Sequence, residues 1–277
     1  MNGLPVELTR QVLSFLQQED LARCFRVCRL WKSVAENDRL WLHLCLDGAD
    51  GAIASMAARK SHESLRRRLR LATSLSIQQT PFASLPFLFQ ETQSLQQLSL
   101  HGLRHLDCET LIQYFTHPNT SLLEVSLQRS HIIDRVVACL LGHHASTLST
   151  LDLAFTPIND LSLECISASN CLKSLSLAAC FNLSAKGVRR FLVSTSPKTI
   201  VQLDLRQLHY IHSGWIDSFI HLNESLRSVD ITGCDEVTRQ DIRRLVHQRP
   251  DLEVRHLAKL EEHSAWGYAQ YIKSITS

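Results

Sequence analysis

The chain has 277 residues, of which 44% are apolar and 20% are charged, with a formal net charge of +2. This length allows one large domain or two, and the apolar content is sufficient for a sizeable core. The near balance of charge argues against a dedicated nucleic-acid or membrane-surface binder, because such proteins usually carry a strong basic excess.

The nine cysteines and the first residues favour a reducing compartment. The opening sequence MNGLPVELTR has no basic segment followed by an apolar one, as a secretory leader would have. No apolar run approaches the roughly 18 residues needed to span a bilayer. The cysteine count is odd and no Cys-x-x-Cys pair occurs, so we expect thiols packed as small hydrophobes in the cytosol or the nucleus.

Residues 1–45 predict a small helical unit. One helical face carries four apolar side chains, those of Leu8, Val12, Phe15 and Leu16. Asp20 is expected to cap a second helix, and Trp31 and Trp41 extend the apolar surface. A unit of this size buries too little surface to be stable alone, so it must pack on the rest of the chain or on another protein.

Residues 46–70 predict a linker and a helix that lead into the next region. Ile53 and Met56 mark the helix, and the segment ends in a basic cluster from Arg66 to Arg70. A solvated helix face beside Glu63 is the favoured interpretation of this cluster, and a nuclear signal or a patch for an acidic partner stays open.

Residues 71–257 repeat a short Leu-x-x-Leu-x-Leu pattern. The fourth position of each copy gives a series of anchors, Leu75, Leu98, Val125, Leu151, Leu175, Leu203 and Val229. Their spacings of 23, 27, 26, 24, 28 and 26 residues match a repeat solenoid of strand and helix. A truncated last copy is anchored at Leu252. Residues 258–277, with Trp266, are expected to cap the last repeat.

Each copy predicts a short strand followed by a helix. Apolar residues alternate at the anchor, and a helix-capping residue follows nine positions later in six copies: Ser84, Asp107, Asp134, Asp160, Ser184 and Thr238. The copy anchored at Leu203 has His212 there and Ser213 next. Six caps in one register are strong evidence for about seven strand–helix repeats and an α/β fold class.

The outward positions of the strands are the expected binding surface of such a solenoid. They are mostly small and polar, with three carboxylates and one arginine. With two aromatic residues beyond the strands, the candidates for substrate contact are His101, Gln128, Asp152, Phe155, Asp204, Arg206, Tyr210 and Asp230.

Two resemblances follow from these residues. Cys180 and Cys234, five positions past their anchors, resemble the cysteine-containing class of leucine-rich repeat. Leu4-Pro5, Glu7-Leu8, Asp20-Leu21, Val27-Cys28 and Trp31 resemble an F-box in order and spacing. The chain is similar to F-box/leucine-rich-repeat proteins: a three-helix F-box followed by a solenoid. The resemblance implies an interface with a Skp-family adaptor at or beside Leu4, Pro5, Leu8, Leu16, Leu21 and Trp31.

The resemblance implies a non-catalytic substrate-recognition subunit of an SCF-type, cullin-based ubiquitin ligase. The expected partners are the adaptor, the cullin scaffold and a substrate protein, with no nucleic acid and no membrane. We expect no catalytic residue, metal or cofactor, since the histidine pairs lack further ligands and no glycine-rich phosphate loop occurs. The alternatives are an interaction scaffold outside a ligase, an inhibitor-like solenoid capped by its N-terminal helices, and an enzyme with a Cys–His pair assembled in space.

Overall fold

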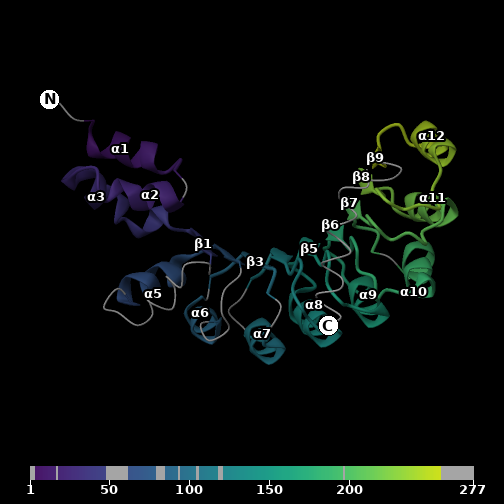
Figure 1. Cartoon of the computed structure of the whole chain (residues 1–277), viewed down its shortest axis with the longest axis horizontal. Helices are drawn as coiled ribbons and strands as arrows, with labels where there is room; N and C mark the ends of the chain where they lie inside the picture. The colour runs from purple at the N-terminus through teal and green to yellow at the C-terminus, as the bar shows by residue number, and fades with distance from the viewer. Residues whose placement is uncertain are drawn as a thin grey trace. The chain divides into compact units, whose positions relative to one another are not determined.

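The computed structural model describes residues 4–16, 18–47, 62–78, 85–92, 94–103, 106–117, 121–195 and 197–256 (Figure 1). The chain divides into two compact units, Met1–Ser126 and Leu127–Ser277. Three predicted features lie outside the described residues: the helix with Ile53 and Met56, the cap at Ser84, and the capping tail 258–277.

The first unit begins with three short helices, α1 (Val6–Leu13), α2 (Gln18–Cys24) and α3 (Arg29–Ala35), and a 3-10 turn, η1 (Asp38–Leu40). Their core contains Leu13, Leu21 and Cys24. The indole of Trp41 is also buried, and its Nε1 donates to the Ala35 carbonyl at 2.8 Å. The buried polar atom of this large side chain therefore has a partner.

Asp20 is not the expected helix cap. Helix α2 begins at Gln18, so Asp20 lies within its first turn and pairs with Arg23 at 2.6 Å. A carboxylate in the first turn is still favourable there, because it faces the positive end of the helix dipole.

The sequence did not predict the first strand of the unit, β1 (His43–Asp47), which crosses the expected boundary at residue 45. Its buried Leu44 and Leu46 alternate with exposed residues. Leu44 pairs in parallel register with the anchor Leu75. The side-chain amide of Gln18 in α2 bonds to both backbone groups of Cys45, at 2.8 Å each. This amide occupies the outer edge of the strand, which would otherwise be unpaired.

Strand–helix repeats follow in the rest of this unit. Strands β1 to β4 pair in parallel and in chain order, with β2 at Ser74–Gln78, β3 at Gln97–His101 and β4 at Glu124–Ser126. The helices are α5 (His62–Leu71), α6 (Leu85–Glu91) and α7 (Cys108–Phe115). The anchors Leu75, Leu98 and Val125 stand opposite one another and are buried.

The second unit continues the same pattern. Its parallel strands are β5 (Thr150–Asp152), β6 (Ser174–Ser176), β7 (Gln202–Asp204), β8 (Ser228–Asp230) and β9 (Glu253–Arg255). Its helices are α8 (Asp134–His144), α9 (Asp160–Ser167), α10 (Ala185–Arg190), which continues in one π-helical turn, η4 (Phe191–Thr195), α11 (Ser213–Leu222) and α12 (Arg239–Gln248). The helices lie along one side of the strands (Figure 1).

From β2 onward in the described chain, each strand up to β8 is followed by a helix, which gives seven strand–helix pairs from β2 and α6 to β8 and α12. This confirms an α/β fold with parallel strand–helix repeats. One anchor was placed wrongly: Val254, not Leu252, stands opposite Val229. Both residues point to the same side of an extended strand, and only the pairing with β8 selects between them.

A left-handed turn follows the strands in six copies, always four residues after the anchor. The residues with positive φ are Gly102, Arg129, Phe155, Ala179, Gln207 and Gly233. The next position is buried in each of these copies, including the two that depart from the cysteine-containing pattern, and it carries Leu103, Ser130, Thr156, Cys180, Leu208 and Cys234. Cys180 and Cys234 donate to the carbonyls of Leu153 and Leu205 in the preceding repeats, at 3.0 and 3.3 Å.

Three predicted helix caps, Asp107, Ser184 and Thr238, accept a backbone N–H in the first turn of their helices. His212 occupies the cap position of α11, but its side chain makes no capping hydrogen bond to the helix. Asp134 is instead the first residue of α8, after Ile133.

The Asp134 carboxylate bonds to the following repeat, accepting from Asn159 N at 2.9 Å and Ser162 Oγ at 2.6 Å. Asp160 is the first residue of α9, after the cap Asn159, and accepts from the backbone and hydroxyl of Ser184. These two predicted caps therefore link successive repeats.

The basic cluster of α5 forms ion pairs within the first unit. Arg66 and Arg70 pair with Glu91 of α6, and Arg67 and Arg68 pair with Asp38 of η1. The Arg68 guanidinium also lies 3.8 Å from the ring centre of Trp41. Helix α5 thus connects the N-terminal helices to the first repeat, and its predicted interpretation as a purely solvated face is incomplete.

Candidate protein-interaction sites

The N-terminal helices carry an exposed apolar stripe, which consists of Leu4, Leu8, Val12 and Phe15. Their exposed fractions are 55%, 47%, 48% and 80%. The spacing of four, four and three residues places them on one side of α1, while Thr9 and Leu13 are buried. Large apolar side chains grouped in this way make this side of α1 a candidate protein-contact surface.

The structure places the predicted adaptor-contact residues at three depths. Leu4, Pro5 and Leu8 are exposed, whereas Leu16 and Trp31 are half-buried. Leu21 is only 2% exposed, so its side chain belongs to the core and supports the surface from below.

The helical spacing predicts Val12 and Phe15 on one apolar face, but the resemblance to an F-box does not point to them as adaptor-contact residues. The spacing of Leu8, Val12 and Phe15 was the available signal. Which face of α1 becomes buried depends on its packing against α3, which the helical spacing alone does not reveal.

A groove of about 420 Å³ lies on the strand face of the second unit. It is lined by residues of β5 to β9 and by Gln128, including five predicted substrate residues: Gln128, Asp152, Asp204, Arg206 and Asp230. The strand alternation explains this surface, because the anchors face the core and the residues on either side of each anchor face outward. We refer to this site as the strand groove.

The aspartates of the strand groove have a structural role as well as a surface position. Asp152 and Asp230 each accept the backbone N–H two residues ahead, at 2.9 and 3.0 Å. Asp204 accepts the corresponding N–H of Arg206 at 3.1 Å. Each carboxylate thereby fixes the chain direction at the end of its strand.

The Arg206 guanidinium forms a bidentate ion pair with Asp204. Its Nε and Nη2 donate to the two oxygens of Asp204 at 2.9 and 2.8 Å, and Asp230 lies 3.8 Å away. These bonds to Asp204 raise the pKa of Arg206 above its ordinary value, with the nearby carboxylates adding to the effect.

The remaining predicted substrate residues lie outside the strand groove. The Tyr210 hydroxyl donates to the Leu183 carbonyl at 2.8 Å, and burial raises its pKa. Phe155 has its ring 5.0 Å from the Arg129 guanidinium. His101 belongs to β3 of the first unit, half-buried at the end of that strand.

Sequence reasoning missed part of the groove wall. Thr150, Ser174, Gln202, Ser228 and Glu253, each just before its anchor, also line it, as does Arg255. The positions before the anchors were available from the strand alternation. Placing Arg255 on the groove wall requires the register of β9, in which Val254 and not Leu252 is the anchor.

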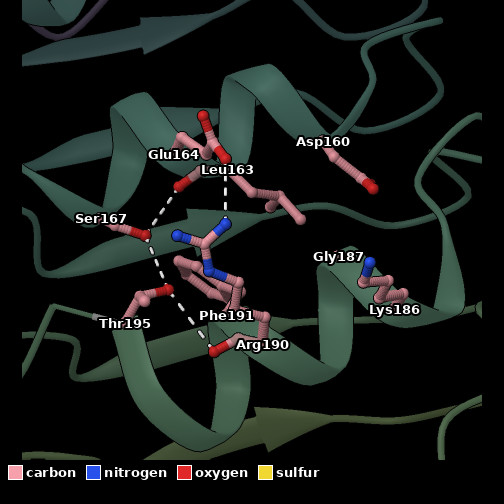
Figure 2. Close-up of a pocket in the computed structure, with 9 residues that line it drawn as sticks. All are labelled: Asp160, Leu163, Glu164, Ser167, Lys186, Gly187, Arg190, Phe191 and Thr195. Carbon is pink, nitrogen blue, oxygen red and sulfur yellow. Dashed lines mark hydrogen bonds and ion pairs between the residues drawn. The ribbon is translucent and has the colours of Figure 1, made fainter.

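A second, smaller hollow of about 240 Å³ lies between α9 and α10–η4 on the helix side of this unit (Figure 2). Arg190 pairs with Glu164 across it at 3.1 Å, and Ser167 donates to Thr195 at 3.0 Å. The Asp160 carboxylate occupies the space beside Gly187, where a Cβ atom would stand within 2.2 Å of it. The side chains of this hollow are thus engaged in holding neighbouring helices together.

One cysteine lies beside a histidine in α8: Cys139 Sγ is 3.9 Å from His143 Nδ1, but burial raises the pKa of this thiol. All nine cysteines are free thiols. Burial raises the pKa of Cys180 and of Cys234 to about 12, which disfavours the nucleophilic thiolate. Across the described ranges, no group of three or more histidine, cysteine or acidic side chains is placed to hold a metal ion. Within the same residues, no helix has the length and apolar character to cross a membrane.

Comparison with protein families gives a match at the N-terminal helices and β1. The F-box-like family model matches residues 1–47. Residues 1–47 are therefore similar to an F-box-like domain. The matched residues include the apolar stripe and end at β1, and the match leaves the repeats unassigned.

Curated relatives match over the same part. An F-box protein of Saccharomyces cerevisiae is 45% identical over 42 residues, which is 15% of this chain and 7% of that protein. "F-box only protein 16" of Homo sapiens is 46% identical over 43 residues, 16% of this chain and 15% of that protein. "F-box/LRR-repeat protein 5" of Danio rerio is 41% identical over 44 residues, which is 16% of this chain and 6% of that protein. The chain therefore spans only a small part of these relatives.

Solved structures resemble the chain weakly. "Rad7 and Elc1 complex in yeast" matches 93% of this chain and 91% of the other at 15% identity, with a TM-score of 0.38. The actin-binding site 2 of leiomodin-1 matches 54% of this chain and 85% of the leiomodin chain at 16% identity, with a TM-score of 0.37. The fold assignment rests on the strand pairing of this chain itself.

Proposed function

We propose that this chain is a non-catalytic substrate-recognition subunit of an SCF-type ubiquitin ligase. Its F-box-like domain binds a Skp-family adaptor, and its repeats, of the cysteine-containing leucine-rich class, bind a substrate protein. The observation that carries the proposal is the exposed apolar stripe within the matched domain. The expected place of action is the cytosol or the nucleus.

The apolar stripe supports adaptor binding because the packing of the domain itself leaves these side chains exposed. Leu8 and Val12 remain nearly half exposed although Leu13, one residue further along the helix, is completely buried. Exposing such a surface to water is unfavourable, and covering it with a partner lowers the free energy. Val27, 59% exposed before α3, adds a further apolar contact point.

The repeats support substrate binding through their open strand face. The helices pack on one side of the strands of the second unit, and the other side carries the strand groove. Catalysis by this chain is not part of the mechanism. Holding the substrate beside a ubiquitin-charged enzyme raises their effective concentration, and the fixed repeats set the distance between them.

The test is co-purification of the full chain with a Skp-family adaptor. The double variant Leu8→Asp, Phe15→Asp places two charges in the stripe, and both positions are exposed, so the fold should persist. We expect adaptor affinity to fall more than about a hundredfold, because each apolar contact at the centre of an interface contributes roughly 2 kcal/mol. The control is Leu161→Asp, Val246→Asp, which alters two exposed apolar residues of the repeats.

The outcomes separate the main alternatives. Loss of binding in the stripe variant alone supports the adaptor interface. A folded wild-type chain that does not bind the adaptor contradicts the proposal. Adaptor binding without incorporation into a cullin complex, or without ubiquitin transfer to a bound protein, favours an interaction scaffold outside the ligase.

A further inference from the structure

The strand groove is acidic. Four carboxylates line it, those of Asp152, Asp204, Asp230 and Glu253, against two guanidinium groups, those of Arg206 and Arg255. Four negative and two positive charges leave a net charge of −2 within one hollow. A concave site with one sign of charge concentrates ligands of the opposite sign.

The two guanidinium groups are already engaged by carboxylates of the groove itself. Arg206 donates to both oxygens of Asp204, and Arg255 donates from Nε to Glu253 at 2.8 Å. An incoming anion would have to compete with these bonds. With Arg206 paired to Asp204 and Arg255 paired to Glu253, the excess charge of the groove is negative, which disfavours acidic ligands.

The floor between the aspartates is made of small side chains. Strand register places Ser176 of β6 between Asp152 of β5 and Asp204 of β7. The Cα atoms of these two aspartates are therefore separated by about 10 Å, twice the spacing of neighbouring strands. Ala154 and Ala178, two residues past the ends of β5 and β6, are small and buried. A long cationic side chain can lie over β6 and approach Asp152, or approach Asp204 in competition with Arg206 and with the Ser176 hydroxyl, which donates to Asp204 at 2.9 Å.

We propose that the strand groove binds a lysine- or arginine-containing segment of a protein substrate, whose cationic side chains lie over β6 between Asp152 and Asp204. Asp230 extends the acidic surface along the next strand. This inference rests on the proposed function only in that it names the class of substrate for the repeats. Acidic and phosphorylated segments are disfavoured by the same charges.

The test uses the full chain and two fluorescein-labelled synthetic peptides of equal length, one of lysine, arginine and serine and the other of glutamate and serine. Fluorescence anisotropy measures their binding at low salt and at roughly 0.15 M salt. We expect binding of the basic peptide, weakened by salt, and no binding of the acidic one. Preferential binding of the acidic peptide overturns the inference, as does failure of both to bind.

Two variants locate the binding in the groove. Asp152→Asn, Asp230→Asn keeps the oxygen that accepts each backbone N–H, and it should weaken basic-peptide binding about tenfold, since each partly exposed charge contributes less than about 1 kcal/mol. Arg206→Gln removes a competitor for Asp204 and should strengthen binding about threefold. Unchanged binding in the double variant, or weaker binding in Arg206→Gln, contradicts the proposed site.

The matched control is Glu164→Gln, Glu236→Gln, which removes the same charge from exposed carboxylates outside the groove. We expect its binding to change less than about twofold, because screening limits distant surface charges. Adaptor co-purification on the same preparations separates the two proposals. Adaptor binding without groove-dependent peptide binding overturns this inference alone, and the reverse result overturns the ligase proposal alone.

Discussion

The N-terminal helices and the repeats differ in how their exposed large apolar side chains are distributed. In the helices, Leu4, Leu8, Val12 and Phe15 gather on one exposed stripe. In the described part of residues 71–257, exposed large apolar residues occur singly in different segments: Leu71, Leu123, Ile133, Leu161, Phe181, Leu222 and Val246. The two regions have similar helical patterns in sequence, yet only one presents an apolar surface.

The difference follows from how each region completes its core. A repeat buries its apolar strand positions against the next repeat, so the array satisfies itself along its length. Three short helices have no such neighbour on their outer side and are too small to bury all their apolar residues. The grouped apolar surface is the reason that we propose a partner for the first region, and the polar groove is the reason that we propose a separate contact surface in the second.

The largest expected effect breaks the repeat core. Leu175 is 1% exposed and stands between Leu151 and Leu203 in the strand register. Leu175→Ala should lower the free energy of unfolding by about 2–5 kcal/mol, because it leaves a cavity among fixed neighbours. Denaturant unfolding followed by circular dichroism measures this change. Leu8→Ala is the control and should stay within about 0.5 kcal/mol; an equal loss there would contradict the comparison.

A pH series should sharpen the same contrast through the buried thiols. Burial raises the pKa of Cys180 and Cys234 to about 12, whereas an unfolded thiol titrates near about 8.5. Their contribution to stability is therefore complete below about pH 8.5 and is lost progressively as the pH rises towards 12. With both thiols together, we expect a loss of roughly 2 kcal/mol per pH unit above about pH 9.

The matched variant for the pH series is Cys180→Ser, Cys234→Ser, which keeps a hydrogen-bond donor at each turn but does not titrate in this range. Its stability should depend less steeply on alkaline pH than that of the wild-type chain, with reductant present throughout. Denaturant unfolding at pH 8, 9 and 10 measures both slopes. Parallel slopes would show that these thiols are not buried as described.

The connection between the two regions gives a smaller effect. Asp38 pairs with Arg68, whose side chain is 14% exposed and whose pKa burial lowers, with Asp38 opposing that shift. Asp38→Ala leaves this guanidinium without its carboxylate and should cost about 1–2 kcal/mol in chemical unfolding. The control Glu164→Ala breaks the exposed pair with Arg190 and should cost less than about 1 kcal/mol. Equal costs would mean that α5 does not hold the N-terminal helices.

Local periodicity was enough to predict the inward residues of the strands. The anchors from Leu75 to Val229 are buried as expected, since alternation along a strand is a local property. Features that depend on a neighbouring repeat could not be read in this way. Asp134 had the composition of a helix cap, but its bonds to Asn159 and Ser162 require the next repeat to be in place.

The same limit applies to the candidate sites. Several groove residues were predicted from the alternation, whereas Arg255 depended on the pairing of β9 with β8. The F-box-like pattern identified the first region but not the exposed face of α1, because Leu13 and Phe15 are both apolar and only packing buries one of them.

The smallest expected effect concerns the turns that make the repeats regular. Ala179 has a φ of 54°, while Gly102 and Gly233 occupy the equivalent turns in other repeats. A left-handed conformation costs a residue with a Cβ atom about 1–2 kcal/mol, and part of the gain from glycine is lost to its greater freedom when unfolded. Ala179→Gly should therefore raise the free energy of unfolding by about 0.5 kcal/mol, measured in the same denaturant series. Ala178→Gly, one residue earlier and without a positive φ, is the control and should be destabilising. If both variants lose stability equally, the turn is not strained, and the regularity of the repeats depends on their buried side chains alone.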